Sequence, residues 1–133
     1  MQPIRSSMFL RRVLLIDAVS SAGMAAALLL FATTLADLLS LPADLISEAG
    51  LVLIPFAVFV GYLATREHPS RVGVWAVIAL NAVWTIDSIL LLFTSWIQPN
   101  VPGYAFVIGQ AIVVGVFAEL EYIGVRKSVA AHA

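Results

Sequence analysis

Five polar side chains stand out because each lies inside a long run of apolar residues: Asp17, Asn81, Asp87, Gln110 and Glu119. Carboxyl groups hold or release protons and carboxamides donate and accept hydrogen bonds, so together these groups could bind a proton or a small cation. An ionisable side chain at membrane depth costs about 2.5–3.5 kcal/mol, so each acid is expected to pair, to be protonated or to meet water. These five residues form the candidate intramembrane polar site.

Helical spacing divides these side chains into two groups at different depths. Asp17, Asn81 and Glu119 are expected to line one inner polar pocket. Asp87 lies about 24 Å along its helix from the cytoplasmic end, beyond reach of any cytoplasmic cation. It is expected at an outer site with Gln110. A path for protons or cations needs stacked sites of this kind. Two pairs of side chains with a purely structural role would give the same sequence pattern.

Two of these acids also have a structural interpretation. Asp87 could be a protonated carboxyl that donates a hydrogen bond to Gln110 or to a carbonyl group and so joins two helices. Asp17 could stabilise the first turn of its helix and pair with Arg11 or Arg12. The alternatives are contact with water or a bound cation at Asp87 and a place in the inner pocket at Asp17.

Two acids close together in the last apolar run are expected to play different parts. Glu119 shares a helical stripe with Gly115, which is typical of a close-packing face. Glu121 lies near the cytoplasmic end of the run and is expected to extend to the interface or to pair with Arg126 or Lys127. Glu119 is therefore assigned to the candidate site and Glu121 to a structural role.

Composition places the chain in a lipid bilayer and excludes several kinds of chemistry. Of 133 residues, 62% are hydrophobic and 11% charged, against ~25% charged in a soluble domain. With no cysteine, disulfides, thiolate metal sites and iron–sulfur clusters are excluded. His68 and His132 lie outside the apolar runs, so neither can be an intramembrane haem ligand. We therefore expect that the chain is not an enzyme and that it binds no cofactor or metal. Its net charge of −1 argues against binding to nucleic acid.

Four apolar runs are each long enough to cross a bilayer as a helix. They cover approximately 13–39, 48–64, 72–93 and 104–125. A membrane-spanning helix needs roughly 17–25 residues, and only a helix pairs all its backbone groups within one segment in lipid. The links are short, so consecutive helices should be antiparallel neighbours. The predicted fold is all-α, an integral membrane four-helix up-down bundle that forms a single transmembrane domain over 1–133.

The polar side chains of each run predict how much of that helix is buried against the other helices. The third run shows polar groups in two directions, so we expect it to be the most enclosed helix. The second run has Tyr62 as its one polar side chain between 49 and 63. It is expected to be the most lipid-exposed helix, with Ala57 and Gly61 allowing close approach of a second copy.

The cations predict the orientation of the chain. All of them flank the same side of the four runs, and the links at 36–47 and 95–103 contain none. They are Arg5, Arg11, Arg12, Arg66, Arg71, Arg126 and Lys127. By the positive-inside rule, both termini and the central link are expected in the cytoplasm.

The two halves of the chain resemble each other. Asp17-Ala18-Val19 with Ser21 matches Asn81-Ala82-Val83 with Thr85, and 62–66 matches 122–126. Each half holds two apolar runs, so both halves would enter the membrane in the same sense. This pattern indicates a parallel two-helix repeat related by an axis along the membrane normal.

Three segments of the second half carry a family resemblance. They are 96–99 (Trp-Ile-Gln-Pro), 106–111 (Phe-Val-Ile-Gly-Gln-Ala) and 118–126 (Ala-Glu-Leu-Glu-Tyr-Ile-Gly-Val-Arg). In these segments the chain resembles uncharacterised small four-span inner-membrane proteins of bacteria. The resemblance implies a place in the inner (plasma) membrane and a four-helix fold, and it implies no chemistry.

Two functions of different classes fit these patterns. The first is a structural or accessory bundle that associates with itself as a homodimer or with a larger membrane complex. The second is a small proton- or cation-coupled transporter, expected as a homodimer, that uses the intramembrane carboxylates Asp87 and Glu119 together with Asn81, and to which Asp17 could also contribute. In both, the bilayer is the surrounding partner and nucleic acid plays no part.

Overall fold

The computed structural model describes residues 4–5, 8–127 and 129–130, and helices make up nearly all of it. The elements are β1 (Ile4–Arg5), α1 (Met8–Leu30), α2 (Ala32–Leu39), α3 (Ala43–Thr65), α4 (Arg71–Leu91), α5 (Val101–Lys127) and β2 (Val129–Ala130). β1 and β2 are two-residue segments that pair antiparallel. Helices α1, α3, α4 and α5 are long and apolar enough to cross a membrane. The predicted all-α membrane bundle is confirmed.

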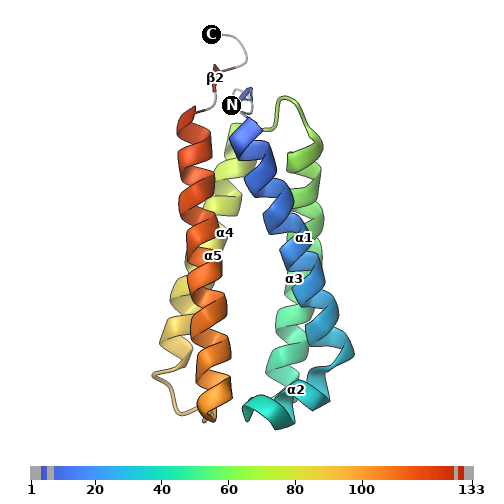
Figure 1. Cartoon of the computed structure of the whole chain (residues 1–133), viewed down its shortest axis with the longest axis vertical. Coiled ribbons are helices and arrows are strands. Elements are labelled where there is room, and N and C mark those ends of the chain that lie inside the picture. Colours follow the sequence, from blue (N-terminus) through green and yellow to red (C-terminus); the bar gives the residue numbers. More distant parts are fainter. Residues whose placement is uncertain (1–3, 6–7, 128, 131–133) are drawn as a thin grey trace.

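The four long helices run alternately in opposite directions along the bundle (Figure 1). α1 packs most extensively on α3, and α4 packs most extensively on α5, so the bundle consists of two antiparallel hairpins. The main contact between the hairpins is that of α1 with α5, whereas α3 and α4 touch only slightly. Both hairpins run in the same sense, as a parallel two-helix repeat requires.

Matching residues of the two halves make matching contacts. The Arg66 guanidinium lies 5.4 Å from the centroid of the Tyr62 ring, and that of Arg126 lies 5.8 Å from the centroid of Tyr122. Both are cation–π contacts one helical turn apart. The same pair of residues therefore closes the last turns of α3 and of α5.

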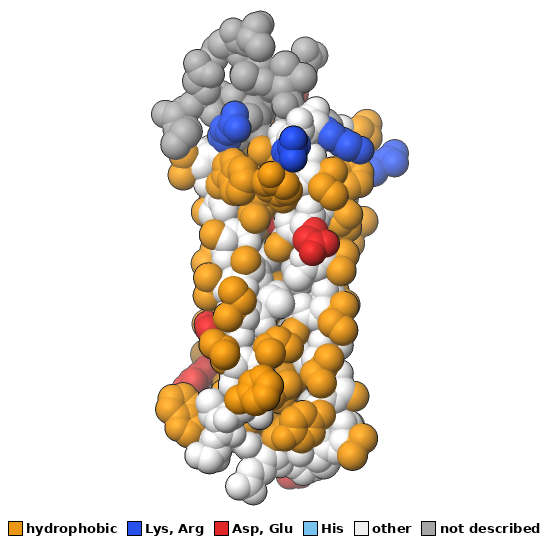
Figure 2. Space-filling view, turned by 90° about the vertical axis from the view of Figure 1, so that its left-hand side faces the viewer, with side chains coloured by type: hydrophobic (Ala, Val, Ile, Leu, Met, Phe, Trp, Pro, Cys, Tyr) orange, Lys and Arg blue, Asp and Glu red, His pale blue; other side chains and the backbone are white. Residues whose placement is uncertain are grey.

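Cationic side chains gather at one end of the bundle, as Figure 2 shows. Helices α1, α4 and α5 contain these cations, except for Arg66, which directly follows α3. The described cations of the helical part are Arg11, Arg12, Arg66, Arg71, Arg126 and Lys127. We call this the basic end, and the opposite end the far end. His132 lies outside the described residues.

The first predicted span, 13–39, is not one helix. α1 ends at Leu30 and α2 begins at Ala32, with Phe31 at φ −119° and ψ 26° between them. The 23 residues of α1 already extend about 35 Å, which exceeds a hydrocarbon layer of ~30 Å. α2 therefore turns across the far end (Figure 1) and ends at Ser40, whose φ of 54° is left-handed.

The other spans also start at residues other than the predicted ones, and the residue before each helix accounts for its start. α3 begins directly after Pro42 rather than at 48, since proline suits the start of a helix. The Ser70 hydroxyl accepts a hydrogen bond from the backbone N–H of Gly73 at 3.2 Å and caps α4. Asn100 Oδ1 accepts one from the N–H of Gly103 at 2.8 Å, so α5 starts at Val101 rather than 104.

The prediction of which helices are most and least buried is wrong. Within the described chain, α4 has the smallest buried share of the four long helices and α1 the largest, while α3 is not the most exposed. Ala57 is buried, and a Cβ on Gly61 would lie 3.7 Å from Ala18 of α1. These small residues allow α1 and α3 to approach closely within one chain.

Candidate functional site

Three polar side chains from three helices meet inside the bundle. Asn81 of α4 donates through Nδ2 to Oδ2 of Asp17 on α1, at 2.9 Å, and to Oε1 of Glu121 on α5, at 2.7 Å. The exposed fractions are 3% for Asn81, 2% for Asp17 and 0% for Glu121. We call Asp17, Asn81 and Glu121 the polar clasp, because their hydrogen bonds join one hairpin to the other.

Neighbouring hydroxyls support the clasp from one turn away. Ser21 Oγ donates to Oδ1 of Asp17 at 3.3 Å, and Thr85 Oγ1 donates to the backbone oxygen of Asn81 at 2.9 Å. Both amide hydrogens of Asn81 are in use, since a carboxamide nitrogen has two donors. Asn81 lies about 15 Å along α4 from Arg71, near the middle of that helix. The clasp is therefore well inside the membrane-spanning part.

The close crossing of α1 and α5 brings two of these side chains together. Gly124 lies against Leu10, so that a Cβ on Gly124 would be 3.0 Å from the Leu10 Cβ and 3.1 Å from its Cα. Only glycine permits this approach. Asp17 and Glu121 lie one to two turns farther along their helices and consequently face each other.

The clasp contains two acids and no cation. Among the described residues, no Lys or Arg pairs with Asp17 or Glu121, and both carboxyls accept hydrogen bonds from one nitrogen, Nδ2 of Asn81. Oε2 of Glu121 is buried without a hydrogen-bond partner in the described chain. Two buried negative charges side by side without a cation are strongly unfavourable. The clasp therefore fits a pair of acids of which one is protonated.

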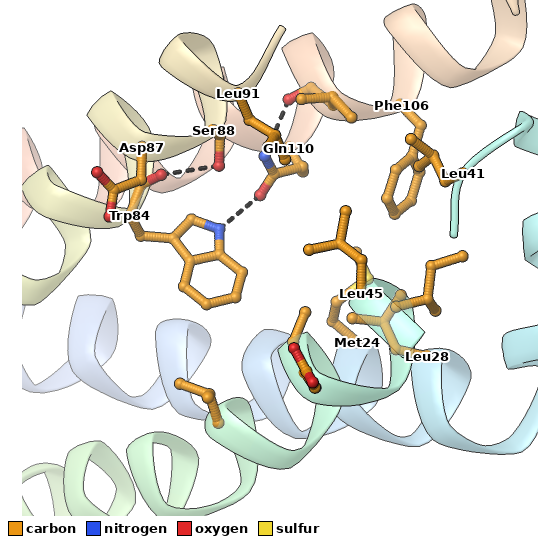
Figure 3. Close-up of a pocket in the computed structure, with 15 residues that line it drawn as sticks. Met24, Leu28, Leu41, Leu45, Trp84, Asp87, Ser88, Leu91, Phe106 and Gln110 are labelled. Atoms are coloured by element: carbon orange, nitrogen blue, oxygen red, sulfur yellow. Dashed lines mark hydrogen bonds between the residues drawn. The ribbon is translucent and has the colours of Figure 1, made fainter. Parts of the chain in front are cut away.

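A second polar group lies toward the far end of the bundle. Trp84 Nε1 donates to Oε1 of Gln110 at 2.7 Å, which joins α4 to α5. Gln110 Nε2 donates to the backbone oxygen of Val107 at 2.9 Å, and Ser88 Oγ donates to that of Trp84 at 2.7 Å (Figure 3). The expected hydrogen bond between Asp87 and Gln110 is not formed, because Trp84 occupies the Gln110 oxygen.

Three cavities surround Trp84, which lines all of them. The outer cavity, about 350 Å³, lies between the hairpins toward the far end and is lined by both Asp87 and Gln110. A cavity of about 430 Å³ between α3 and α4 is lined by Asn81 and Asp87. A third, about 360 Å³, lies between α1 and α5 and is lined by Asp17 and Gln110. The polar clasp thus borders two cavities.

The structure brings some of the sequence-predicted site residues together and separates others. Asp17 and Asn81 are in direct contact, as the inner pocket requires. Asp87 and Gln110 line the outer cavity without a bond between them. Glu119 is exposed on α5 and does not enter the polar clasp. The expected inner group is therefore correct for two residues and wrong for Glu119.

Glu121 is the clasp residue that the sequence interpretation missed. Its expected pairing with Arg126 or Lys127 is wrong, since those cations lie over the rings of Tyr122 and Phe9. Asp17, likewise, is bonded to Ser21 and Asn81 rather than to Arg11 or Arg12.

A sequence signal for Glu121 exists but is ambiguous. The buried face of α5 follows Val107, Ala111, Ala118, Glu121 and Val125, which is a helical spacing of three, four and seven. The stripe through Gly115 and Glu119 has similar spacing and similarly small residues. Nothing in this single sequence decides between the two faces.

Comparisons with protein-family models, with curated proteins and with solved structures find no match. The function must therefore be argued from the polar clasp and the cavities themselves.

Proposed function

We propose that this chain is a non-enzymatic accessory bundle of a bacterial inner membrane, which associates with itself or with a larger membrane complex. The observation that carries the proposal is the polar clasp. Its hydrogen bonds run between α1, α4 and α5 of one chain, as polar groups do when they hold membrane helices together. The short links add no sizeable domain outside the membrane, so association would take place through the lipid-facing helices.

The lipid-facing surface is large and apolar. Exposed aliphatic side chains occur on all four long helices, including Leu51 and Val58 on α3 and Ile112 and Val116 on α5. Such faces are equally suited to acyl chains and to another apolar helix, so they permit association in the membrane. They supply no catalytic group.

Native mass spectrometry of the protein in lipid nanodiscs tests the self-association. The proposal predicts a dimer or larger assembly that persists when the lipid-to-protein ratio is raised. A monomer at every ratio, together with failure to assemble with any membrane complex extracted from the same native bilayer, would contradict it.

The second candidate is a proton- or cation-coupled transporter, and one specific observation favours it. The polar clasp borders the cavity between α3 and α4, and that same cavity is lined by Asp87 about 9 Å farther along the helix. A proton on Asp17 or Glu121 is thus separated by one hydrogen-bonded residue, Asn81, from a space that Asp87 also lines.

Flux measurements in proteoliposomes separate the two candidates. A pH-sensitive dye trapped inside would report proton movement driven by a pH gradient. The accessory role predicts no flux above that of empty liposomes, and loss of thermal stability alone in clasp variants. Transport predicts flux that Asp17→Asn and Asp87→Asn abolish, while the exposed Glu119→Gln leaves it unchanged.

A further inference from the structure

The outer cavity differs from the rest of the bundle in the charge of its lining. All four long helices contribute to it, and most of its lining is apolar, with Met24 and Leu28 of α1 facing Phe106 of α5 (Figure 3). Two carboxyls, Glu48 and Asp87, also line it, and no Lys or Arg does. The described cations of the helices lie at the basic end. The cavity is therefore apolar with a negative rim.

Glu48 and Asp87 reach the cavity from two helices at a similar depth. Glu48 lies about 7.5 Å along α3 from its start, and Asp87 about 6 Å from the end of α4, so both are near the far end of the bundle. Neither forms a hydrogen bond or ion pair with another residue of the described chain. Their charges are available to a ligand.

The other polar groups of the cavity are already satisfied. Trp84 and Gln110 bond to each other, Gln110 also bonds to a backbone oxygen, and so does Ser88. A ligand would consequently find few hydrogen-bonding groups, but two free carboxyls and an indole ring. This lining selects for positive charge and apolar bulk together, since aromatic rings attract cations and the remaining side chains exclude water.

A metal ion fits this lining poorly. Hard cations require several oxygen ligands, and no group of three or more His, Cys, Asp or Glu side chains converges anywhere in the described chain. A zwitterionic phospholipid would bring its phosphate toward the same two carboxyls. An organic cation with an apolar body avoids both problems.

We propose that the outer cavity binds a lipophilic organic cation, with Asp87 and Glu48 neutralising its charge and the Trp84 ring contacting its apolar body. The volume of about 350 Å³ lies at the lower end of the range for small-molecule sites, ~300–1,000 Å³. This inference concerns binding alone and does not depend on whether the bundle is an accessory protein or a transporter.

Tetraphenylphosphonium is a suitable probe, and tetraphenylborate is its matched control of the same shape and opposite charge. The chain has three tryptophans, so Trp75→Phe and Trp96→Phe leave Trp84 as the reporter inside the cavity. Titration of this variant in a non-ionic detergent should give saturable quenching by the cation and none by the anion beyond that seen with empty micelles.

Acid variants in the same background identify the groups responsible. Asp87→Asn should weaken binding roughly tenfold, as expected for loss of one partly enclosed charge. Asp87→Asn with Glu48→Gln should remove saturable binding, and Glu119→Gln, on a different face, should leave it unchanged. All three positions are exposed, so the variants should fold, which circular dichroism checks. Equal quenching by both probes, or unchanged binding in the double variant, would overturn the proposal.

Discussion

At the scale of single residues, Asn81 links the two hairpins through side-chain hydrogen bonds. Its amide bonds both Asp17 and Glu121, and no other described side chain contacts both acids by hydrogen bonds. A hydrogen bond between membrane helices contributes about 0.6 kcal/mol on average and up to about 1.7 kcal/mol. A buried group left unsatisfied costs a further ~1–3 kcal/mol.

Asn81→Leu should therefore lower the free energy of unfolding by about 2–4 kcal/mol, because two bonds are lost and two acids lose their shared donor. Ser88→Ala is the matched control on the same helix, since Ser88 bonds only to the backbone oxygen of Trp84. Unfolding of both variants in detergent, followed by circular dichroism, checks the difference. Equal stability of the two variants would mean that the clasp does not hold the hairpins.

Glu121 and Glu119 offer a second comparison at this scale. Glu121→Gln should keep stability within about 1 kcal/mol of the original, because a carboxamide is neutral like a protonated carboxyl and its oxygen still accepts from Asn81. Glu121→Ala should lose about 2–4 kcal/mol through the cavity and the unpaired groups it leaves. Glu119→Ala, at an exposed position, should change little. Thermal unfolding measures the stability of the two alanine variants. If Glu119→Ala is the more destabilising of the two, Glu121 is not the acid that holds the clasp.

The choice between these two acids also shows where sequence reasoning stops. Asp17 and Asn81 could be grouped in advance because helical rise alone sets their depth. Choosing Glu119 or Glu121 requires the rotation of α5 about its axis, and at ~100° per residue the two acids point to nearly opposite sides. Both sides carry small residues, so the contact of Gly124 with Leu10 decides the matter only once the helices are packed.

At the scale of helices, close crossings depend on individual glycines. Gly124→Ala should destabilise the bundle by about 1–3 kcal/mol, because the new methyl group would press on the Cα and Cβ of Leu10 as well as on its Cδ1, so that moving the side-chain end alone does not relieve the contact. Gly109→Ala on the same helix is the control, since its Cβ would meet nothing within 4 Å. Thermal unfolding of the pair checks this, and a loss of stability at Gly109 comparable to that at Gly124 would contradict the packing described.

The sequence predicts that the four long helices exist, but it does not predict where they begin and end. Four spanning helices follow from apolar content summed over many residues, which tolerates local exceptions. The bend at Phe31 and the starts of α3 and α5 depend instead on single contacts. One example is Asn100, whose side-chain nitrogen donates to the backbone oxygen of Leu38 at 2.9 Å across a long sequence separation. Such contacts are not visible before the elements are packed.

At the scale of the whole molecule, the gathering of cations at one end predicts the orientation in the membrane. The cysteine-free chain allows single-cysteine variants, with His68→Cys at the basic end and Ser95→Cys at the far end, both exposed. A membrane-impermeant maleimide should label position 95 in intact bacterial cells and position 68 only after the membrane is opened. Labelling of position 68 in intact cells would reverse the orientation.

The polar clasp joins the two hairpins, and its two acids, Asp17 and Glu121, together carry one proton. Infrared difference spectroscopy in lipid at neutral pH, comparing the original protein with the double variant Asp17→Asn, Glu121→Gln, measures this most directly. The prediction is that the difference contains one protonated carboxyl band, sensitive to deuterium exchange, and one carboxylate. Two carboxylates and no protonated band would contradict the account.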